Sequence, residues 1–503
     1  MIENNRSSRE QGMEKNFFRA SAADFKRVSG NPIAYWLSPR ILDAFESHKS
    51  LSEYATPRQG LATSDNNRFV RSWSEVALCK IGFGCGNREE AKESNKRWFP
   101  FNKGGSFRRW AGNNELVVNW EADGRDIKDS ILTKYPYLNG NPDFVAKNPN
   151  YYFRAGLTWS ALSSGLFSIR LQSEGYIFAD KGQAMFPFEK QHLLPLEGLL
   201  NSKITVEFLK AISPTLDFNA GYIAKIPCLL KLSSGVSRLN EASLSDWNSY
   251  ETAWGFTTHT LLIADYRQPT LQATYQKLRA HWREMTLETQ RLEEENNRIF
   301  IDAYGLQDEL TPEVLLNEIT LTCNPHYRYG GDKSEEELEA LLLADTMREL
   351  VSYAVGCMLG RYSLDKSGLI LANQGETLAE YLAQVPEPSF PADDDNVIPM
   401  MNAYGDSRDD DWFADDITKR FRQFLRVAFG EAHYDENLAF IEQALNVKGK
   451  RNYSLRDYFL SEFYADHVKR YKKRPIYWLF SSPKGSFNAL RCHRVLAGPS
   501  SNC

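Results

Sequence analysis

The middle of the chain shows the clearest pattern of apolar and polar positions. Within Thr270–Arg298, apolar residues return every three, four or seven positions, which predicts a long amphipathic helix. The pair Thr311–Pro312 predicts the cap and first position of a second helix. Ser334 and Glu337 form a capping box for a third helix, which ends near Gly360. This part is therefore predicted to be mainly helical.

The preceding part has short apolar runs separated by Gly, Asn and other turn residues. Three of these runs predict strands, at Val117–Trp120, Phe167–Arg170 and Tyr176–Phe178. A helical apolar stretch opens at Gly198–Lys203, continues through Phe208 and stops before Pro214. We therefore predict an α+β protein, with a mixed α/β region followed by a mainly helical C-terminal region.

The last part of the chain contains two acidic runs and a basic end. Asp393–Asp395 and Asp409–Asp411 flank a loop-like stretch, while the sign of the charge reverses within Arg451–Arg494. The acidic runs lack the glycine and terminal glutamate of an EF-hand loop. We therefore expect no metal ligand in them.

Composition limits the possible functions. The 503 residues carry 60 Lys and Arg against 65 Asp and Glu, a net charge of −5, and 13% are aromatic. This excludes wholesale disorder and a uniformly basic nucleic-acid coat, so a polyanion site must be a local patch. Seven scattered cysteines without metal spacing suggest reduced thiols. A polar N-terminus and the absence of an 18-residue apolar run predict a soluble cytoplasmic protein without a membrane partner.

No catalytic constellation is visible. Gly82–Gly86 is a glycine-rich turn, but no clear βαβ unit follows it, so an ordinary loop is the better interpretation. Asn31–Ala34 begins like the Asn-Pro-Pro-aromatic motif of amino-methyltransferases, yet Ile33 and Ala34 replace the second proline and the ring. Pro142–Asp143 lacks the acidic residue and lysine of a metal-dependent nuclease. We predict no catalytic or metal-binding residue.

Two segments combine cations, amides and rings. Lys80–Trp110 holds eight Lys and Arg against three Glu, mixed with Trp and Phe, and Arg58–Arg68 is rich in amide and hydroxyl groups. Arg and Lys suit phosphates and guanine, whereas Asn and Gln suit adenine edges. A solvated basic surface beside core aromatics explains the same composition equally well.

Several stretches also resemble a known family. The chain resembles the PglX family, the adenine-specific DNA methyltransferases of BREX phage-exclusion systems, in these blocks: Pro57–Thr63, Asn67–Phe69, Lys96–Gly105, Asn150–Ser160, Leu199–Lys203, Asn296–Ile301, Ser352–Ser363 and Arg474–Ser482. The similarity extends over nearly the whole chain. The ending from Arg491 to Cys503 departs from the family pattern.

The resemblance implies a division of labour. Family members carry an N-terminal domain with S-adenosylmethionine and Asn-Pro-Pro-Tyr/Phe motifs, and we expect this chain to begin after them. We expect no S-adenosylmethionine to bind this chain alone, although the intact enzyme would use it. The expected regions are a connector at 1–56, a target-recognition α/β domain at 57–230, a helical region at 231–370 and a C-terminal region at 371–503.

The leading hypothesis is the DNA-recognition portion of an adenine methyltransferase, with double-stranded DNA, a catalytic half and other BREX proteins as partners. The candidate DNA-contacting residues are Arg58, Gln59, Thr63, Asn66, Asn67, Arg68, Arg71, Arg97, Lys103, Arg108, Arg109, Trp110 and Lys203. One alternative is a non-catalytic truncated or split-gene protein that acts as an interaction module in the defence complex. Another is a methyltransferase that acts alone, which predicts S-adenosylmethionine binding in isolation.

Overall fold

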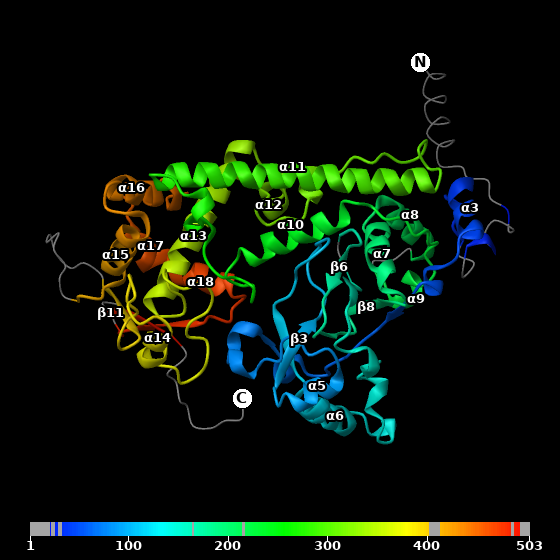
Figure 1. Ribbon diagram of the computed structural model, residues 1–503, viewed down its shortest axis with the longest axis horizontal. Helices are drawn as coiled ribbons and strands as arrows, with labels where there is room; N and C mark the ends of the chain where they lie inside the picture. Colours follow the sequence, from blue (N-terminus) through cyan, green and yellow to red (C-terminus); the bar gives the residue numbers. More distant parts are fainter. Residues whose placement is uncertain are drawn as a thin grey trace, which may run out of the picture.

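The computed structural model describes residues 21, 26–28, 33–162, 165–213, 217–401, 413–483 and 487–492. Its mixed helices and small sheets confirm the predicted α+β class. Figure 1 shows a long helix, α11 (Leu271–Ala303), along the top of the molecule, with the sheets of the first part below it. The C-terminal helices gather at its left-hand end. The predicted acidic run Asp409–Asp411, the Asn31–Pro32 motif and the ending from 493 lie outside the described residues.

The first sheet is antiparallel and separates two hydrophobic cores. Its order is β1 (Ala55–Arg58), β8 (Gly182–Pro187), β5 (Gly156–Ser160) and β6 (Ile169–Gln172). Leu157 and Trp159 of β5 face a core shared with the helices α3 (Pro39–Ser47), α7 (Leu193–Leu200) and α8 (Lys203–Ile212), here called the helix–sheet core. Successive side chains of a strand point to opposite faces, so Ala184 and Phe186 of β8 enter the other core.

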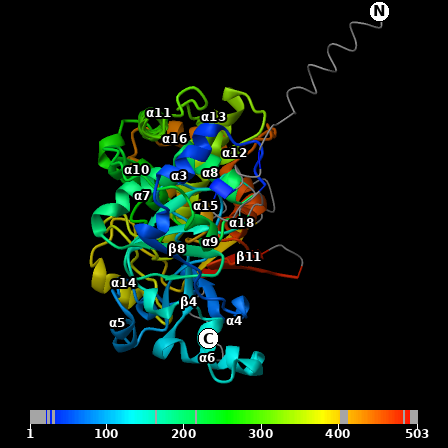
Figure 2. The ribbon, with the colours of Figure 1, turned by 90° about the vertical axis from the view of Figure 1, so that its right-hand side faces the viewer.

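The second core lies between the first sheet and a second one, and is called the sheet core. The second sheet has the order β2 (Val70–Ser72), β4 (Leu116–Asn119), β3 (Trp98–Asn102) and β7 (Ile177–Phe178). Three helices accompany it, namely α4 (Asn66–Phe69), α5 (Arg88–Glu93) and α6 (Glu121–Lys134). Phe99, Val118 and Ile127 are completely buried here. In Figures 1 and 2, α5 and α6 lie at the lower end of the molecule, away from α11.

A third core, the C-terminal core, is mainly helical. It extends from Phe256 to Cys492 and includes residues of α11. The remaining elements are α9 (Ala220–Ile223), α10 (Val236–Asn248), α12 (Pro325–Tyr329), α13 (Glu335–Met358), α14 (Leu378–Gln384), β9 (Val397–Met401), α15 (Ile417–Phe429), α16 (Tyr434–Leu445), α17 (Leu455–Tyr458), α18 (Tyr464–Arg470), β10 (Tyr477–Ser481) and β11 (Phe487–Cys492). The last three strands form a sheet of order β10-β11-β9.

Helix α11 connects the cores. At about 1.5 Å per residue, its 33 residues span roughly 50 Å. Leu278 and Trp282 near its start belong to the C-terminal core, whereas Phe300 and Ile301 near its end belong to the helix–sheet core. A single uninterrupted helix therefore holds the two cores at a fixed separation.

The long helices follow their sequence signals. Helix α11 begins after Thr270, whose side chain accepts from Ala273 N–H, as its amphipathic pattern predicts. Ser334 and Glu337 make both bonds of the predicted capping box of α13. The apolar stretch predicted from Gly198 is instead two helices, since α7 ends at Leu200 and α8 begins at Lys203.

The helix predicted after Thr311 is wrong. Side chains of α11 bind the backbone of this segment: Asn297 donates to the Pro312 carbonyl at 3.0 Å and Gln290 donates to the Val314 carbonyl at 2.6 Å. Glu294 accepts from Val314 N–H at 3.1 Å. The Pro312 and Val314 carbonyls, which a helix would pair internally, are used in these contacts, so tertiary bonding overrides the local cap signal.

The predicted region boundaries at 56, 230 and 370 stay predictions. The helix–sheet core contains residues from Val28 to Leu306 and so crosses the first two positions, and the C-terminal core crosses the third. Within the described ranges, no helix combines the length and the apolar character that a bilayer crossing requires.

Candidate nucleic-acid interface

Two segments of the sheet region, 58–71 and 134–154, lie against each other through direct hydrogen bonds. Lys147 donates its Nζ to Gln59 Oε1 at 2.9 Å, and Asn148 donates to the Gln59 carbonyl at 2.8 Å. Lys134, the last residue of α6, donates to the Ser64 carbonyl at 3.0 Å. These bonds join the two segments into one surface, which we call the two-loop surface.

An arginine–tyrosine–arginine cluster marks one side of the two-loop surface. The guanidinium carbons of Arg58 and Arg154 each lie 5.2 Å from the centre of the Tyr151 ring. Arg58 also donates to Tyr151 Oη at 3.5 Å, and this contact lowers the pKa of the Tyr151 phenol below its usual value. Stacked guanidinium groups keep their N–H edges available for phosphate oxygens.

Helix α4 presents the predicted amides at the surface. Asp65 caps it by accepting from Arg68 N–H at 3.0 Å, and Asn66, Asn67 and Arg68 are all exposed. Thr63 is buried, and its hydroxyl donates to Asn66 Oδ1. The Asn67 amide and the Arg68 guanidinium of this turn are exposed to solvent, while Thr63 orients the Asn66 side chain, whose amide nitrogen stays exposed.

Arg71 and Arg97 approach the same ring. Their guanidinium carbons lie 5.8 Å and 5.6 Å from the ring centre of Trp98. Arg71 Nη1 also donates to the Asn67 carbonyl at 2.6 Å, which links it to the turn at α4. The surface therefore continues from Arg58 through Asn67 to Arg71 and Arg97.

Two predicted lysines are not among the exposed cations of this surface. Lys103 is half-buried, and its burial lowers the pKa of its ammonium group. Lys203 opens α8 beside α11, where its backbone N–H donates to Asn297 Oδ1 at 3.0 Å. The structure does not bring Lys203 together with the 58–71 segment.

Arg108 is buried, contrary to a role in contacting DNA. It is 2% exposed, and its Nη2 binds Asp246 Oδ2 at 2.6 Å. Its Nη1 donates to Thr322 Oγ1 at 2.9 Å, and its Nε donates to the Ala111 carbonyl at 2.9 Å. Asp246 accepts further N–H groups from the Thr322–Cys323 segment. Every donor atom of this guanidinium group therefore has a partner inside the protein.

Arg109 and Trp110 form a second buried contact, with α11. Arg109 Nη1 lies 2.6 Å from Glu293 Oε2, and its Nη2 lies 3.3 Å from Glu318 Oε2. Trp110 donates its Nε1 to Glu293 Oε1 at 2.7 Å. These contacts and those of Arg108 are together called the Arg108–Trp110 lock. The three predicted DNA contacts instead fasten the sheet region to the helices, so we remove them from the surface.

The two-loop surface is positive in an acidic protein. Segments 58–71 and 134–154 contain six Lys and Arg against two Asp, whereas the whole chain has a net charge of −5. The six cations are Arg58, Arg68, Arg71, Lys134, Lys147 and Arg154. Within the described part of the chain, none of these six forms an ion pair with a carboxylate. Unneutralised cations grouped on one surface are the electrostatic footprint of a polyanion site.

Three members of the two-loop surface escaped the sequence analysis. Lys134, Lys147 and Arg154 are separated from Arg58 by 76 or more positions and stand singly among uncharged residues. A cation count along the sequence gives such isolated residues no weight. Asn150–Ser160 did stand out through the family resemblance, which was a signal that Arg154 belonged to the same region.

The glycine turn Gly82–Gly86 does not fit S-adenosylmethionine. Gly82 N–H donates to the Trp98 carbonyl at 2.8 Å, and Gly86 N–H donates to Glu90 Oε2 at 2.8 Å. A cofactor loop needs free amides facing the ligand and a substantial helix behind them. Here the first and last amides of the turn are satisfied internally, and the following helix, α5, has only six residues.

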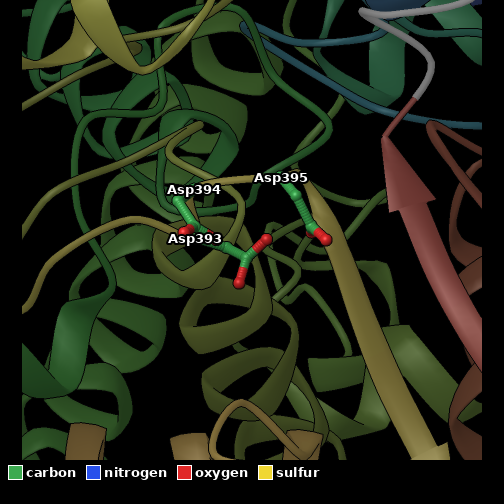
Figure 3. Close-up of side chains that lie close together, drawn as sticks. All are labelled: Asp393, Asp394 and Asp395. Atoms are coloured by element: carbon green, nitrogen blue, oxygen red, sulfur yellow. The ribbon is translucent and has the colours of Figure 1, made fainter.

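An acidic cluster lies before β9. The carboxylates of Asp393, Asp394 and Asp395 lie within 4.8 Å of one another (Figure 3). Asp393 and Asp395 both accept from Val397 N–H, at 3.1 and 2.8 Å. Burial and the neighbouring Asp395 raise the pKa of Asp393 to about 6. These carboxylates serve the start of the strand, and we assign them no metal.

A second charged site, a cleft in the helical part, is internally balanced. A cavity of about 320 Å³ lies among α10, α12, α13 and α18, and its lining contains the cations Arg328, Arg348, Lys469 and Arg470 and the carboxylates Glu251, Asp345, Glu349 and Asp466. Arg328 pairs with Asp345 and Glu349, and Arg348 pairs with Asp345. Equal numbers of cations and carboxylates make this cleft a poor polyanion site, unlike the two-loop surface.

Comparison with known proteins gives relatives of one kind. No family model matches the chain. The chain is 36% identical over 486 residues to the adenine-specific methyltransferase PglX of Lacticaseibacillus casei (strain Zhang), and 34% identical over 475 residues to the adenine-specific methyltransferase BrxX of Escherichia coli O9:H4 (strain HS). The alignments cover 94% and 92% of this chain but 37% of each relative. The chain thus spans little more than a third of these relatives, and the resemblance is confirmed.

Proposed function

Because the chain is homologous to the adenine-specific methyltransferases PglX and BrxX, we propose that it is the DNA-recognition portion of a BREX-type adenine methyltransferase. In the intact enzyme, a methyl group from S-adenosylmethionine would pass to the exocyclic amine of an adenine flipped out of the duplex. This chain would grip the DNA, while a catalytic portion and other BREX proteins would complete the defence function.

The observation that carries the proposal is the two-loop surface. Its six cations have no carboxylate partner among the described residues, so phosphate groups can neutralise them. The exposed amides of Asn66 and Asn67 lie between these cations and suit base edges. Phosphate contacts would position the duplex, and the amides would read it.

Salt-dependent binding tests the proposal. A fluorescently labelled 30-base-pair duplex pool of mixed sequence is titrated with the 503-residue chain, and anisotropy is followed between 50 and 200 mM salt. If about five of the cations neutralise phosphates, affinity falls roughly 100- to 1,000-fold over this range, because each contact contributes about 0.9 to the logarithmic slope. Arg68→Ala or Lys134→Ala lowers that slope by about one.

The matched control is Arg291→Ala. Arg291 is exposed on α11 and pairs with Glu288 and Glu295, so its removal changes net charge equally without touching the two-loop surface. Its salt slope should equal that of the unmodified chain. If the chain shows no affinity for DNA at 50 mM salt but still captures other BREX proteins, the interaction-module alternative is correct and the proposal is wrong.

A further inference from the structure

Two aromatic rings project from the tip of the two-loop surface. Tyr137 is 70% exposed and Phe144 is 67% exposed, although neither is charged. Both belong to the segment that follows α6, at the lower end of the molecule in Figures 1 and 2. Large apolar side chains exposed to this extent, on one short segment at an end of the molecule, mark an interaction surface.

Both aromatic residues lie in hydrogen-bonded turns. Tyr137 lies in a short 3-10 turn, Pro136–Leu138, and Phe144 lies in another, Pro142–Phe144. Asn141 connects them, because its N–H donates to the Leu138 carbonyl at 3.0 Å and its side chain accepts from Asp143 N–H at 3.0 Å. The rings therefore extend from a backbone that is already folded.

The surroundings of the rings favour DNA as the partner. The Nζ of Lys147 lies 5.8 Å from the ring centre of Phe144, and the same Nζ binds Gln59 of the two-loop surface. Lys134 lies beside Tyr135, whose ring centre is 5.9 Å from that of Tyr137. Phe144 is thus next to Lys147, and Tyr137 is linked to Lys134 through the Tyr135 ring. Neither lysine has an ion-pair partner among the described residues, and both belong to the proposed phosphate-binding residues.

We propose that Tyr137 and Phe144 insert between base steps of the DNA held by the two-loop surface. This inference rests on the proposed function, since the phosphate contacts must first place the duplex at the tip. Apolar side chains that wedge into a base step unstack it and kink the duplex. The tip would deform DNA and favour flexible steps, which adds selectivity at positions that receive no hydrogen bond.

Plasmid topology measures insertion without knowledge of the recognised sequence. A nicked plasmid is sealed with DNA ligase in the presence of a saturating amount of the 503-residue chain, the protein is removed, and the topoisomers are resolved on a gel. Insertion unwinds the duplex, so the sealed plasmid shows a lowered linking number. Binding to the same plasmid is measured in parallel by filter retention.

Two variants distinguish insertion between bases from binding to the DNA backbone. The double variant Tyr137→Ala with Phe144→Ala should weaken plasmid binding by roughly tenfold. At saturation, plasmid sealed in its presence should have the same linking number as plasmid sealed without protein. Phe188→Ala is the control, because Phe188 is 62% exposed beyond the end of β8, next to Tyr54 and away from the tip. It should retain the full topological change.

Each other outcome overturns the inference. If the unmodified chain binds plasmid but does not change the linking number, insertion is wrong while the proposed function stands. If the double variant changes topology as much as the unmodified chain, another element deforms the DNA. If the unmodified chain does not bind plasmid at all, both proposals fail, and the exposed rings then serve a protein partner.

Discussion

Replacing Arg109 tests whether the Arg108–Trp110 lock is structural. Arg109 neutralises Glu293, which is 4% exposed and whose pKa is raised by burial even with Arg109 beside it. Arg109→Ala leaves that carboxylate buried without its cation. Removing one partner of a buried ion pair costs about 3–5 kcal/mol, so we expect the free energy of unfolding to fall by that amount.

Urea denaturation, followed by tryptophan fluorescence and near-ultraviolet circular dichroism, measures the effect. Arg109→Met combined with Glu293→Gln removes both charges and keeps an acceptor for Trp110 Nε1, so it should recover most of the loss. Arg68→Ala is the matched control: an exposed arginine of the two-loop surface, it should change stability by less than about 0.5 kcal/mol while weakening DNA binding. If instead Arg109→Ala leaves the urea midpoint unchanged and weakens DNA binding as Arg68→Ala does, the lock is wrong and Arg109 contacts DNA.

Two further predictions concern pH. Burial raises the pKa of Glu197 to about 8, from an ordinary 4.5, so the unfolding free energy should fall by about 1.4 kcal/mol per pH unit between pH 4.5 and 8, because only the unfolded state ionises there. Glu197→Gln should remove that slope and be the more stable form at pH 8; equal slopes in the two proteins would contradict this. Asp393, with a pKa of about 6, should destabilise the fold increasingly from pH 4 to 6, by less than Glu197 does over its wider pH range. In thermal melts, Asp393→Asn should abolish this pH dependence, and the control Asp394→Asn should leave it nearly intact.

Local sequence signals predicted the long helices but not the non-helical segment after Thr311, which α11 binds. The amphipathic pattern of α11 and the capping box of α13 act within a few residues, so each can be recognised in the sequence. The cap signal at Thr311 is equally local, yet Asn297 and Gln290 bind the backbone that follows it. Because those contacts come from α11, no pattern within the segment itself could reveal them.

The candidate DNA-contacting residues also depend on partners that are distant in the sequence. Arg68 is exposed and Arg58 is half-buried at the end of β1, whereas Arg108 and Arg109 are buried. The carboxylates that bind the buried pair lie 138 and 184 positions further along the chain. Composition near residue 108 is the same whether these partners are close or distant, so the sequence could not separate a structural arginine from an exposed one.

The buried arginines connect the region that carries the two-loop surface to the rest of the protein. The Arg108–Trp110 lock bonds the loop between β3 and β4 to α11, and α11 in turn enters both the helix–sheet core and the C-terminal core. The segments 58–71 and 134–154 flank the same second sheet, to which β2 and β4 belong. The orientation of the two-loop surface therefore depends on largely buried charge pairs that are not part of that surface. DNA held on that surface would be presented to the rest of a methyltransferase at one angle, and loosening the lock would alter that angle before it altered any DNA contact.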